Sequence, residues 1–443
     1  MNVTVVIYLF YTFKYNKMRN NIFKLLFISI IAFACDDPPD LNHCNNNKFD
    51  SELEEALDCG GKCEPCNPVI IGNELVIKDT SITNSDIATK GLFSFGELIA
   101  NLTPEGKVSK DLILSLFKSF DSDQQLNGFT VRARPIMADI FVEEWKRRDG
   151  QSGISDEDWV INLNNAPLRL LAITSRIDLN ERDSLSAGEG RFTFGQDDNG
   201  ANDFTLIFEY NLNIASAKET EVIKWAKRWH KLSSFRINTP EYMEVLTEIV
   251  TLFTVTDVKL NQIRTNSVIG GPWEFREFNL KDGEFVEVTR KNNPDVSLNN
   301  SSKLKDYLST PEIVDEFNNM NHIVRDSILA GNTQYGISFK WNAEGIDDSI
   351  LEQLDFISCT GCHGGFDTRN QFTHIRPRSI NSEATISPFL IARAEIRKDS
   401  ITSMLRLSQT EVEAMQQFVN EVDTVELKQQ LKLSRLAGIK TIH

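Results

Sequence analysis

The chain has 443 residues, of which 41% are hydrophobic and 25% are charged, so it is long enough for two or three folded units with a sizeable core. Its formal net charge of −16 argues against nucleic acid or an anionic membrane surface as a partner. Such an acidic balance suits an exported protein that must stay soluble, or one that docks a basic redox partner.

The amino-terminal segment has the parts of an export signal. Residues 18–35 read MRNNIFKLLFISIIAFAC, in which Arg19 and Lys24 precede an apolar run of about ten residues. That run is too short to cross a bilayer, although a transmembrane anchor is the alternative interpretation. Ala34 precedes Cys35, an arrangement that resembles the lipobox of bacterial lipoproteins and implies acylation of the cysteine. We expect a signal region over residues 1–34 with the true start at Met18, and a lipid anchor in the outer membrane of a Gram-negative cell envelope.

A dense group of cysteines follows the signal region. Four lie within residues 44–66: Cys44, Cys59, Cys63 and Cys66. Behind an export signal, an even set of this kind predicts disulfides, with zinc as the alternative and three possible pairings. Acidic residues between them could hold calcium or form a solvated face: Asp50, Glu54 and Asp58. We predict a disulfide-rich tether over residues 35–67.

The middle of the chain mixes two hydrophobic periodicities. Residues 81–90 predict a loop, and residues 108–150 predict helices interrupted near Pro135. Strands are predicted at 168–173, 191–194 and 204–212, helices at 218–232 and 240–253, and a hairpin at 275–288 around Lys281-Asp282-Gly283. Because strands and helices are grouped and do not alternate strictly, the fold class is α+β, with a mixed antiparallel-sheet and helix domain over residues 68–345.

This middle region is rich in arginine, tryptophan and glutamate. Such residues suit an anion or sugar site, or else core aromatics with surface ion pairs: Arg169, Arg176, Asp178, Glu189, Arg191, Glu209, Trp225, Trp229, His230, Arg264, Asn266, Trp273 and Glu274. His230 lies on an amphipathic helix and is expected to be structural. We find no catalytic triad, phosphate loop or HExxH motif, so no catalytic residues are predicted and the chain is expected not to be an enzyme.

The most specific motif is Cys359-Thr360-Gly361-Cys362-His363, the spacing that attaches a c-type haem. Two thiols separated by two residues can form thioethers with the two vinyl groups of one haem edge, and the next histidine can bind the iron. The alternatives are a structural disulfide or half of a zinc site, but no second CxxC lies nearby to complete four ligands. We predict one covalent haem c on Cys359, Cys362 and His363.

The carboxy-terminal segment has two predicted helices. Residues 346–357 form an apolar helical face that leads into Cys359, and residues 408–422 begin with a capping box at Ser408 and Glu411. This arrangement resembles class I cytochromes c, which implies a mainly α-helical haem domain over residues 346–443. His374 is the favoured second axial ligand of the iron, and Met404 is the alternative.

Several segments together resemble a poorly characterised family of exported bacterial lipoproteins with a CxxCH motif near the carboxy end. They are LRLLAITSRIDL, EGRFTFG, FTLIFEY, WAKRWHKL, LNQIRTN, PWEFREFNL and SCTGCHGGFDTRNQFTHIRPR, within Pro135 to Arg378. The resemblance implies a fold and a location more than an activity. We therefore expect a lipid-anchored monohaem cytochrome that passes single electrons to a redox partner protein in the envelope, periplasmic or surface-exposed. The alternative is a surface binding lipoprotein in which CxxCH is a disulfide and no haem is bound.

Overall fold

The computed structural model describes residues 76–179, 185–198, 203–216, 219–256, 258–319, 321–334, 336, 339–361, 363, 373–387 and 390. All of them belong to one of the two compact units of the chain, Pro68–His443. The predicted helix at 408–422 lies outside the described residues.

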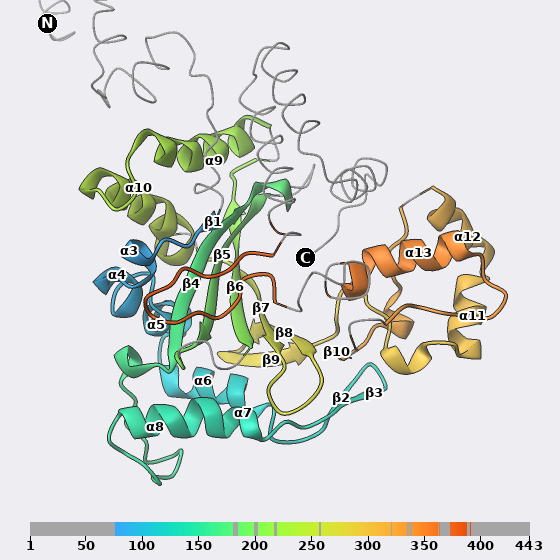
Figure 1. Ribbon diagram of the computed structural model, residues 1–443, viewed down its shortest axis with the longest axis horizontal. Helices are drawn as coiled ribbons and strands as arrows, with labels where there is room; N and C mark the ends of the chain where they lie inside the picture. The colour runs from blue at the N-terminus through green and yellow to red at the C-terminus, as the bar shows by residue number, and fades with distance from the viewer. Residues whose placement is uncertain are drawn as a thin grey trace, which may run out of the picture. The chain divides into compact units, whose positions relative to one another are not determined.

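An antiparallel sheet of eight strands forms the centre of this unit (Figure 1). Seven strands follow one another across it: β1 (Val76–Ile77), β4 (Leu168–Arg176), β5 (Ser186–Gln196), β6 (Phe204–Asn213), β7 (Leu260–Ser267), β8 (Glu274–Lys281) and β10 (Asn332–Gln334). The eighth, β9 (Glu284–Val288), also pairs with β8. The three strands and the hairpin predicted from sequence periodicity are therefore confirmed, and the α+β class with an antiparallel sheet is correct.

One face of the sheet is apolar. Directly opposed residues form a row across five strands, namely Ile173, Phe192, Phe208, Ile263 and Phe278. All five are fully buried in the largest hydrophobic cluster, which also contains aromatic pairs such as Phe194 and Phe208, 5.9 Å apart. Because side chains alternate along a strand, the residues between these apolar positions point to the opposite face.

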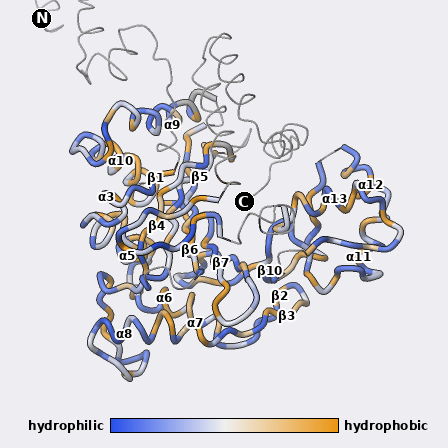
Figure 2. The backbone as a smooth tube through the Cα atoms, viewed as in Figure 1, coloured by the Kyte–Doolittle hydropathy of each residue, from blue (hydrophilic) through white to orange (hydrophobic). Residues whose placement is uncertain are grey.

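Helices complete the core on the apolar face. They are α3 (Thr80–Thr83), α4 (Asp86–Thr89), α5 (Phe95–Leu102), α6 (Ser109–Lys118), α7 (Ile136–Ala138), α8 (Glu144–Arg148), α9 (Glu219–Lys231) and α10 (Pro240–Thr251). A π-helical turn, Asp139–Glu143, joins α7 to α8, and a hairpin of β2 (Gln124–Leu126) and β3 (Phe129–Val131) precedes them. Apolar residues recur through these strands and helices in Figure 2. The loop predicted at 81–90 is wrong, because α3 and α4 form there, each only one turn long.

A second cluster of helices follows the sheet. It consists of α11 (Ser302–Leu308), α12 (Pro311–Asn318) and α13 (Asp348–Ile357). Its hydrophobic core runs from Leu298 to Ile357 and includes Leu304, Phe317 and Leu354. The predicted helix before the CxxCH motif is confirmed as α13, which begins behind an Asp347 cap and delivers the chain to Cys359.

The turn between β8 and β9 follows from its sequence. Asp282 and Gly283 have φ angles of 54° and 81°, the left-handed values that a two-residue type I′ turn requires. The added Cβ of an alanine at Gly283 would also lie 3.3 Å from Pro104. Asp-Gly is therefore the dipeptide that this turn selects, and it sets the register of Glu277 opposite Val288.

Candidate functional site

The second face of the sheet is polar but buried. Residues directly opposed across β4 to β8 form rows such as Thr174, Arg191, Glu209 and Gln262. The side chain of Glu209 is 0% exposed and that of Arg264 is 3% exposed. Buried charged side chains are tolerated only when they are paired with opposite charges. The charged residues on this buried face must therefore form ion pairs.

Arginines and glutamates alternate across this face in what we call the Arg–Glu ladder: Arg290, Glu277, Arg264, Glu209, Arg191 and Glu189. Arg264 donates from Nε to Glu277 Oε1 at 2.8 Å and from Nη1 to Glu209 Oε1 at 3.0 Å. Arg191 Nη2 lies 3.0 Å from the same Glu209 oxygen and 2.6 Å from Glu189 Oε2. The two guanidinium groups therefore converge on one carboxylate oxygen.

Charges within the ladder favour the ionised forms of Glu277, Glu189 and Arg264. Burial alone would raise the pKa of Glu277, but the charges of Arg290 and Arg264 outweigh it and hold that pKa below its usual value. The pKa of Glu189 is lowered against burial in the same way by nearby arginines. Burial would lower the pKa of Arg264, and the charges of Glu209 and Glu277 raise it instead. We conclude that the ladder is a row of paired charges.

A pocket opens on the polar face beside the ladder. Strands β4 to β8, the CxxCH region and the following segment supply its walls: Thr174, Arg176, Arg191, Thr193, Thr205, Ile207, Arg264, Asn266, Phe275, His363, His374, Ile375 and Leu390. The space open to the centres of water molecules is about 70 Å³, enough for a few waters or one small polar group. Residues far apart in sequence thus meet in one cavity with both cationic and apolar walls.

The CxxCH motif forms a tight turn at the end of α13. Cys359–Gly361 is a 3-10 turn, and His363 N donates to Cys359 O at 2.8 Å. A Cβ at Gly361 would lie 2.1 Å from Phe356 O, so only glycine fits the close approach of this turn to α13. The turn places Cys359 and His363 near each other, as the motif requires. Cys362 lies outside the described residues.

The Cys359 thiol is free and fully buried. Its Sγ lies 3.5 Å from Arg290 Nη2 and 3.5 Å from Thr333 Oγ1, in a small cluster with Trp273 and Phe275. Arg290 also pairs with Glu277, so the cysteine touches the end of the Arg–Glu ladder. The first cysteine of the motif therefore packs directly against the polar face of the sheet.

His363 and His374 lie against each other in the pocket. Their ring centres are 4.4 Å apart with an angle of 31° between the rings. His363 is 3% exposed and stacks on Trp273 with ring centres 5.1 Å apart. His374 Nδ1 shares a hydrogen bond of 2.9 Å with Ser387 Oγ. Of the two predicted candidates for the second axial ligand, His374 and Met404, only His374 is among the described residues, and it lies next to His363.

His374 is held there by a folded-back segment, residues 373–387, which we call the strap. Ser387 N donates to His374 O at 2.8 Å and Arg376 N to Thr385 O at 3.0 Å, so the two arms of the strap pair with each other. In Figure 1 the strap, coloured red, crosses β4 to β6. Ile375 and Ala384 pack against Leu171 of β4, which fixes the strap to the sheet.

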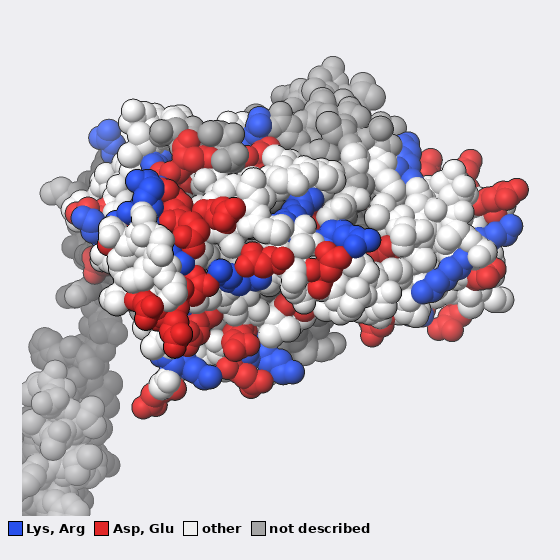
Figure 3. Space-filling view, turned by 90° about the horizontal axis from the view of Figure 1, so that it is seen from below, with Lys and Arg blue, Asp and Glu red and all other residues white. Residues whose placement is uncertain are grey.

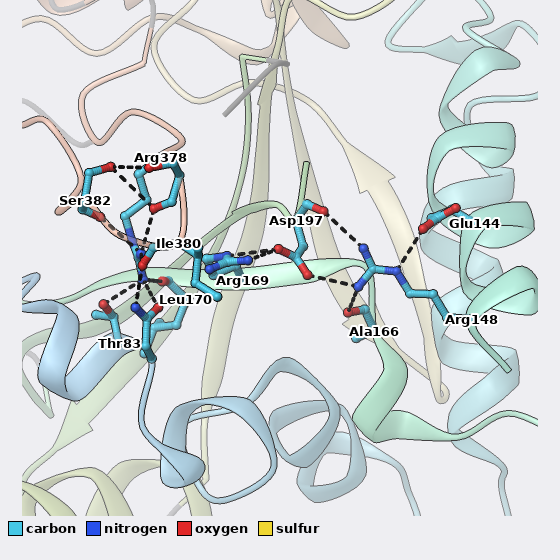
Figure 4. Close-up of polar contacts among 12 residues, drawn as sticks. Thr83, Glu144, Arg148, Ala166, Arg169, Leu170, Asp197, Arg378, Ile380 and Ser382 are labelled. Carbon is cyan, nitrogen blue, oxygen red and sulfur yellow. Dashed lines mark hydrogen bonds and ion pairs between the residues drawn. The ribbon is translucent and has the colours of Figure 1, made fainter. Parts of the chain in front are cut away.

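Arg378 fastens the strap (Figure 4). Its Nη1 donates to the carbonyl oxygens of Ser379, Ile380 and Ser382 within the strap. Its Nη2 donates to Thr83 Oγ1 and Asn84 Oδ1 at the end of α3 and to Leu170 O of β4, at 2.7 to 3.2 Å. One guanidinium group therefore ties the strap to two elements of the core.

Arg169, another arginine predicted as a candidate, lies beside Arg378 in Figure 4 and outside the pocket. It pairs with Asp197, which also receives Arg148 at 3.0 Å. Arg148 in turn donates to Glu144 of α8 at 2.9 Å. This series of ion pairs joins β4 to α8, so Arg169 has a structural role.

The donor atoms in the pocket suit a haem iron, because two imidazoles face one cavity with an aromatic wall from Phe275. Two imidazoles bound to one iron from opposite sides have ring centres about 6 Å apart, since metal–nitrogen bonds are about 2 Å long. The rings of His363 and His374 would have to part by about 2 Å from their 4.4 Å separation to bind in that way. The cavity itself is smaller than a porphyrin, so binding also requires the walls to move.

Nine of the thirteen candidates that the sequence suggested in this region fall into two groups. Trp225, Trp229 and His230 are buried on α9, the first two in the large core, as the structural interpretation predicted. Arg176, Glu189, Arg191, Glu209, Arg264 and Asn266 share the polar face and gather at or beside the pocket. Sequence reasoning missed Glu277, Thr174, Thr193 and Thr205, although their place on or directly after predicted strands, beside apolar residues, is the signal that could have found them, and it also missed Arg290, which lies after β9 and has no such signal.

The other predicted sites lie outside the described residues: Cys35, Cys44, Cys59, Cys63, Cys66, Cys362 and Met404. In the described part of the chain, no helix combines the length and apolar composition needed to cross a bilayer. No group of three or more His, Cys, Asp or Glu side chains among the described residues could hold a metal ion.

Comparison with known proteins does not extend this description. No family model, curated protein or solved structure matches the chain. The resemblance to exported lipoproteins and to class I cytochromes c therefore stays a prediction from the motifs.

Proposed function

We propose that the protein is a lipid-anchored c-type cytochrome of the bacterial envelope that carries one covalent haem and transfers single electrons. Cys359 and Cys362 would attach the haem, and His363 and His374 would bind its iron. When bound, the haem supplies an iron that cycles between two oxidation states, at a potential lowered by a second imidazole relative to methionine. The carboxy-terminal part would form the mainly α-helical haem domain, and the partner would be a redox protein of the envelope.

The observation that carries this proposal is the meeting of His363 and His374 in one pocket. The two histidines come from separate segments, the CxxCH turn and the strap, yet their ring centres lie 4.4 Å apart. Histidine is scarce in this chain, at 6 of 443 residues, so two in one cavity are unexpected by composition alone. A free thiol at Cys359 on the same turn supports the same chemistry.

The second candidate is a surface binding lipoprotein in which the CxxCH cysteines form a disulfide. Full burial of Cys359 among Trp273, Phe275 and Arg290 favours it, because this side chain already packs well without a cofactor. In that case the histidine pair would be part of a polar ligand pocket. The two functions differ in whether the mature protein contains covalent haem.

The full chain should therefore be produced in an exporting host that has haem-attachment machinery. We expect one haem per chain, retained after denaturation, in protein that separates with the membrane fraction. Cys362→Ala should leave at most one thioether and a less stable product, whereas His322→Gln, a control in the α11–α12 cluster, should load haem normally. A folded and colourless wild-type protein from such a host would rule out the cytochrome and favour the binding lipoprotein.

A further inference from the structure

The pocket contains donors that the Arg–Glu ladder leaves unused. Arg191 uses Nε and Nη2 for glutamates, and Arg264 uses Nε and Nη1. Arg191 Nη1 and Arg264 Nη2 consequently have no hydrogen-bond partner among the described residues. Both arginines line the pocket, and both are anchored by the same oxygen of Glu209. Their guanidinium groups are therefore preorganised and close together, with donors to spare.

A third donor points to a missing ligand. Thr174 lines the same pocket and is 3% exposed, yet its hydroxyl has no hydrogen-bond partner in the described structure. A buried polar group without a partner costs free energy, so such a group in a cavity indicates something that normally completes it. Thr174 lies directly opposite Arg191 in the strand register, so the two side chains are on the same face of the sheet, and both line the pocket.

The charge balance of the site favours an anion. The ladder contains three arginines and three glutamates, and Arg176 adds a fourth arginine opposite Glu189 in the register. Three of these arginines, Arg176, Arg191 and Arg264, line the pocket, whereas none of the three glutamates of the ladder is among its lining residues. Carboxylate side chains, in contrast, cover more of the outer face seen in Figure 3 than Lys and Arg do. A cationic pocket in a chain of net charge −16 is thus a local exception.

We propose that Arg191, Arg264 and Thr174 form a binding site for a carboxylate group. Arginine donors match the planar carboxylate, and the cavity of about 70 Å³ accepts a group of that size. The carboxylate belongs either to a small free acid or to a haem held by the neighbouring histidines. The site itself is independent of haem binding, because its donors are built into β4, β5 and β7.

The test uses the full chain prepared with and without haem-attachment machinery. Thermal unfolding is followed in sodium acetate or succinate and in sodium chloride of equal ionic strength. We expect the carboxylates to raise the unfolding temperature of the haem-free protein by a few degrees above chloride. Loss of this effect in haem-loaded protein identifies the haem carboxylates as the occupant, and its persistence identifies a free acid.

Two variants keep the test decisive. Arg191→Gln should weaken acetate binding by about tenfold or more, since a charge-assisted hydrogen bond is lost. Thr174→Val has nearly the same shape and breaks no ion pair, so the variant should fold. In chloride it should unfold at a higher temperature than the wild type, and acetate should raise its unfolding temperature by less. The control Arg169→Gln, which lies outside the pocket, should keep the full acetate effect. The proposal is wrong if acetate and succinate act no better than chloride, or act equally on wild type and Thr174→Val.

Discussion

At the scale of single residues, the proposed haem chemistry depends on which side chain would join His363 at the iron. The strap carries His374 to within 4.4 Å of His363, ring centre to ring centre, and holds its Nδ1 against Ser387. An imidazole oriented by a hydrogen bond at one nitrogen can use the other for a metal. His374 therefore lies next to His363 with a fixed ring orientation, although the two rings would still have to move apart for both to bind one iron.

Replacing His374 by alanine tests this assignment in haem-loaded protein. Loss of a strong-field ligand should open a coordination site, so the reduced haem should take up carbon monoxide and the spectrum should change from low-spin to high-spin. Visible and near-infrared spectroscopy of the variant gives the answer. Met404→Ala is the matched comparison and should leave the spectrum unchanged. If instead the Met404 variant loses a sulfur–iron band and the His374 variant does not change, the ligand is Met404.

The Arg–Glu ladder also depends on single residues. Glu209 is fully buried and accepts from Arg264 and from Gln262 Nε2, the latter at 2.7 Å, while Arg191 lies 3.0 Å away. Removal of one member of a buried ion pair typically costs about 3–5 kcal/mol, because a charge is left without compensation. A pocket with fixed arginines thus requires that glutamates of the same face remain in place.

At the scale of elements, the strap shows how a segment without regular secondary structure is given one position. Few of its backbone groups pair with the sheet, and its contacts come from Ile375, Ala384 and the Arg378 side chain. The guanidinium group has the planar array of donors that six acceptors around it require. Lysine carries three donors on a flexible stem and could not reach both sides.

Arg378→Lys should therefore lower the free energy of unfolding by about 3 kcal/mol, since Leu170 O and Thr83 Oγ1, which are buried, and several part-buried strap carbonyls lose their donor. Urea denaturation measures this change, and limited proteolysis should cut the strap sooner than in the wild type. Arg376→Lys is the control in the same strap, because Arg376 is 43% exposed and lies 3.7 Å from Asp203. Equal stability of the two variants would show that Arg378 does not fasten the strap.

At the scale of the whole molecule, a cluster of buried charged side chains outside the Arg–Glu ladder influences how the free energy of unfolding varies with pH. Glu287 of β9 is buried beside Glu274 and Arg276, and burial, with a smaller opposing effect of Arg276, raises its pKa from 4.5 to about 7. The folded chain therefore keeps this proton up to about pH 7, whereas the unfolded chain releases it near pH 4.5. The stability that the protonated group contributes is complete below pH 4.5 and is lost as the pH rises to 7 and above.

Glu287→Gln keeps the shape of the protonated carboxyl group at every pH. We expect the variant to match the wild type near pH 5 and to exceed it at pH 8 by on the order of 3 kcal/mol, the value of a shift of about 2.5 pH units. Urea denaturation at the two pH values measures the difference. Glu284→Gln, an exposed position on the same strand, should change neither value. A variant that is less stable than the wild type at pH 8 would show that ionised Glu287 stabilises the fold.

Much of the architecture follows from the sequence alone, for local reasons. Strands β4, β5 and β6 were predictable because each is a short run rich in β-branched, aromatic and other apolar residues, such as Ile173, Phe192 and Phe208, and because loop residues separate β5 from β6. The β8–β9 turn follows from Asp282-Gly283 because few residues accept positive φ. The CxxCH turn is equally local, since Cys359 and His363 are four residues apart. Strands of two or three residues, such as β1 and β10, are too short to show a period.

The tertiary structure decided what the polar face of the sheet does. Alternation along β5 and β6 would normally leave Arg191 and Glu209 in solvent, and only the fold of distant segments over this face makes them buried and paired. The sequence identified His363 and His374 as candidates, but no period or motif required their rings to touch. Arg264 meets Glu209 across 55 positions because β6 and β7 are neighbours in the sheet. Such contacts depend on how the chain returns to itself, which is a property of the packed core as a whole and of no local segment.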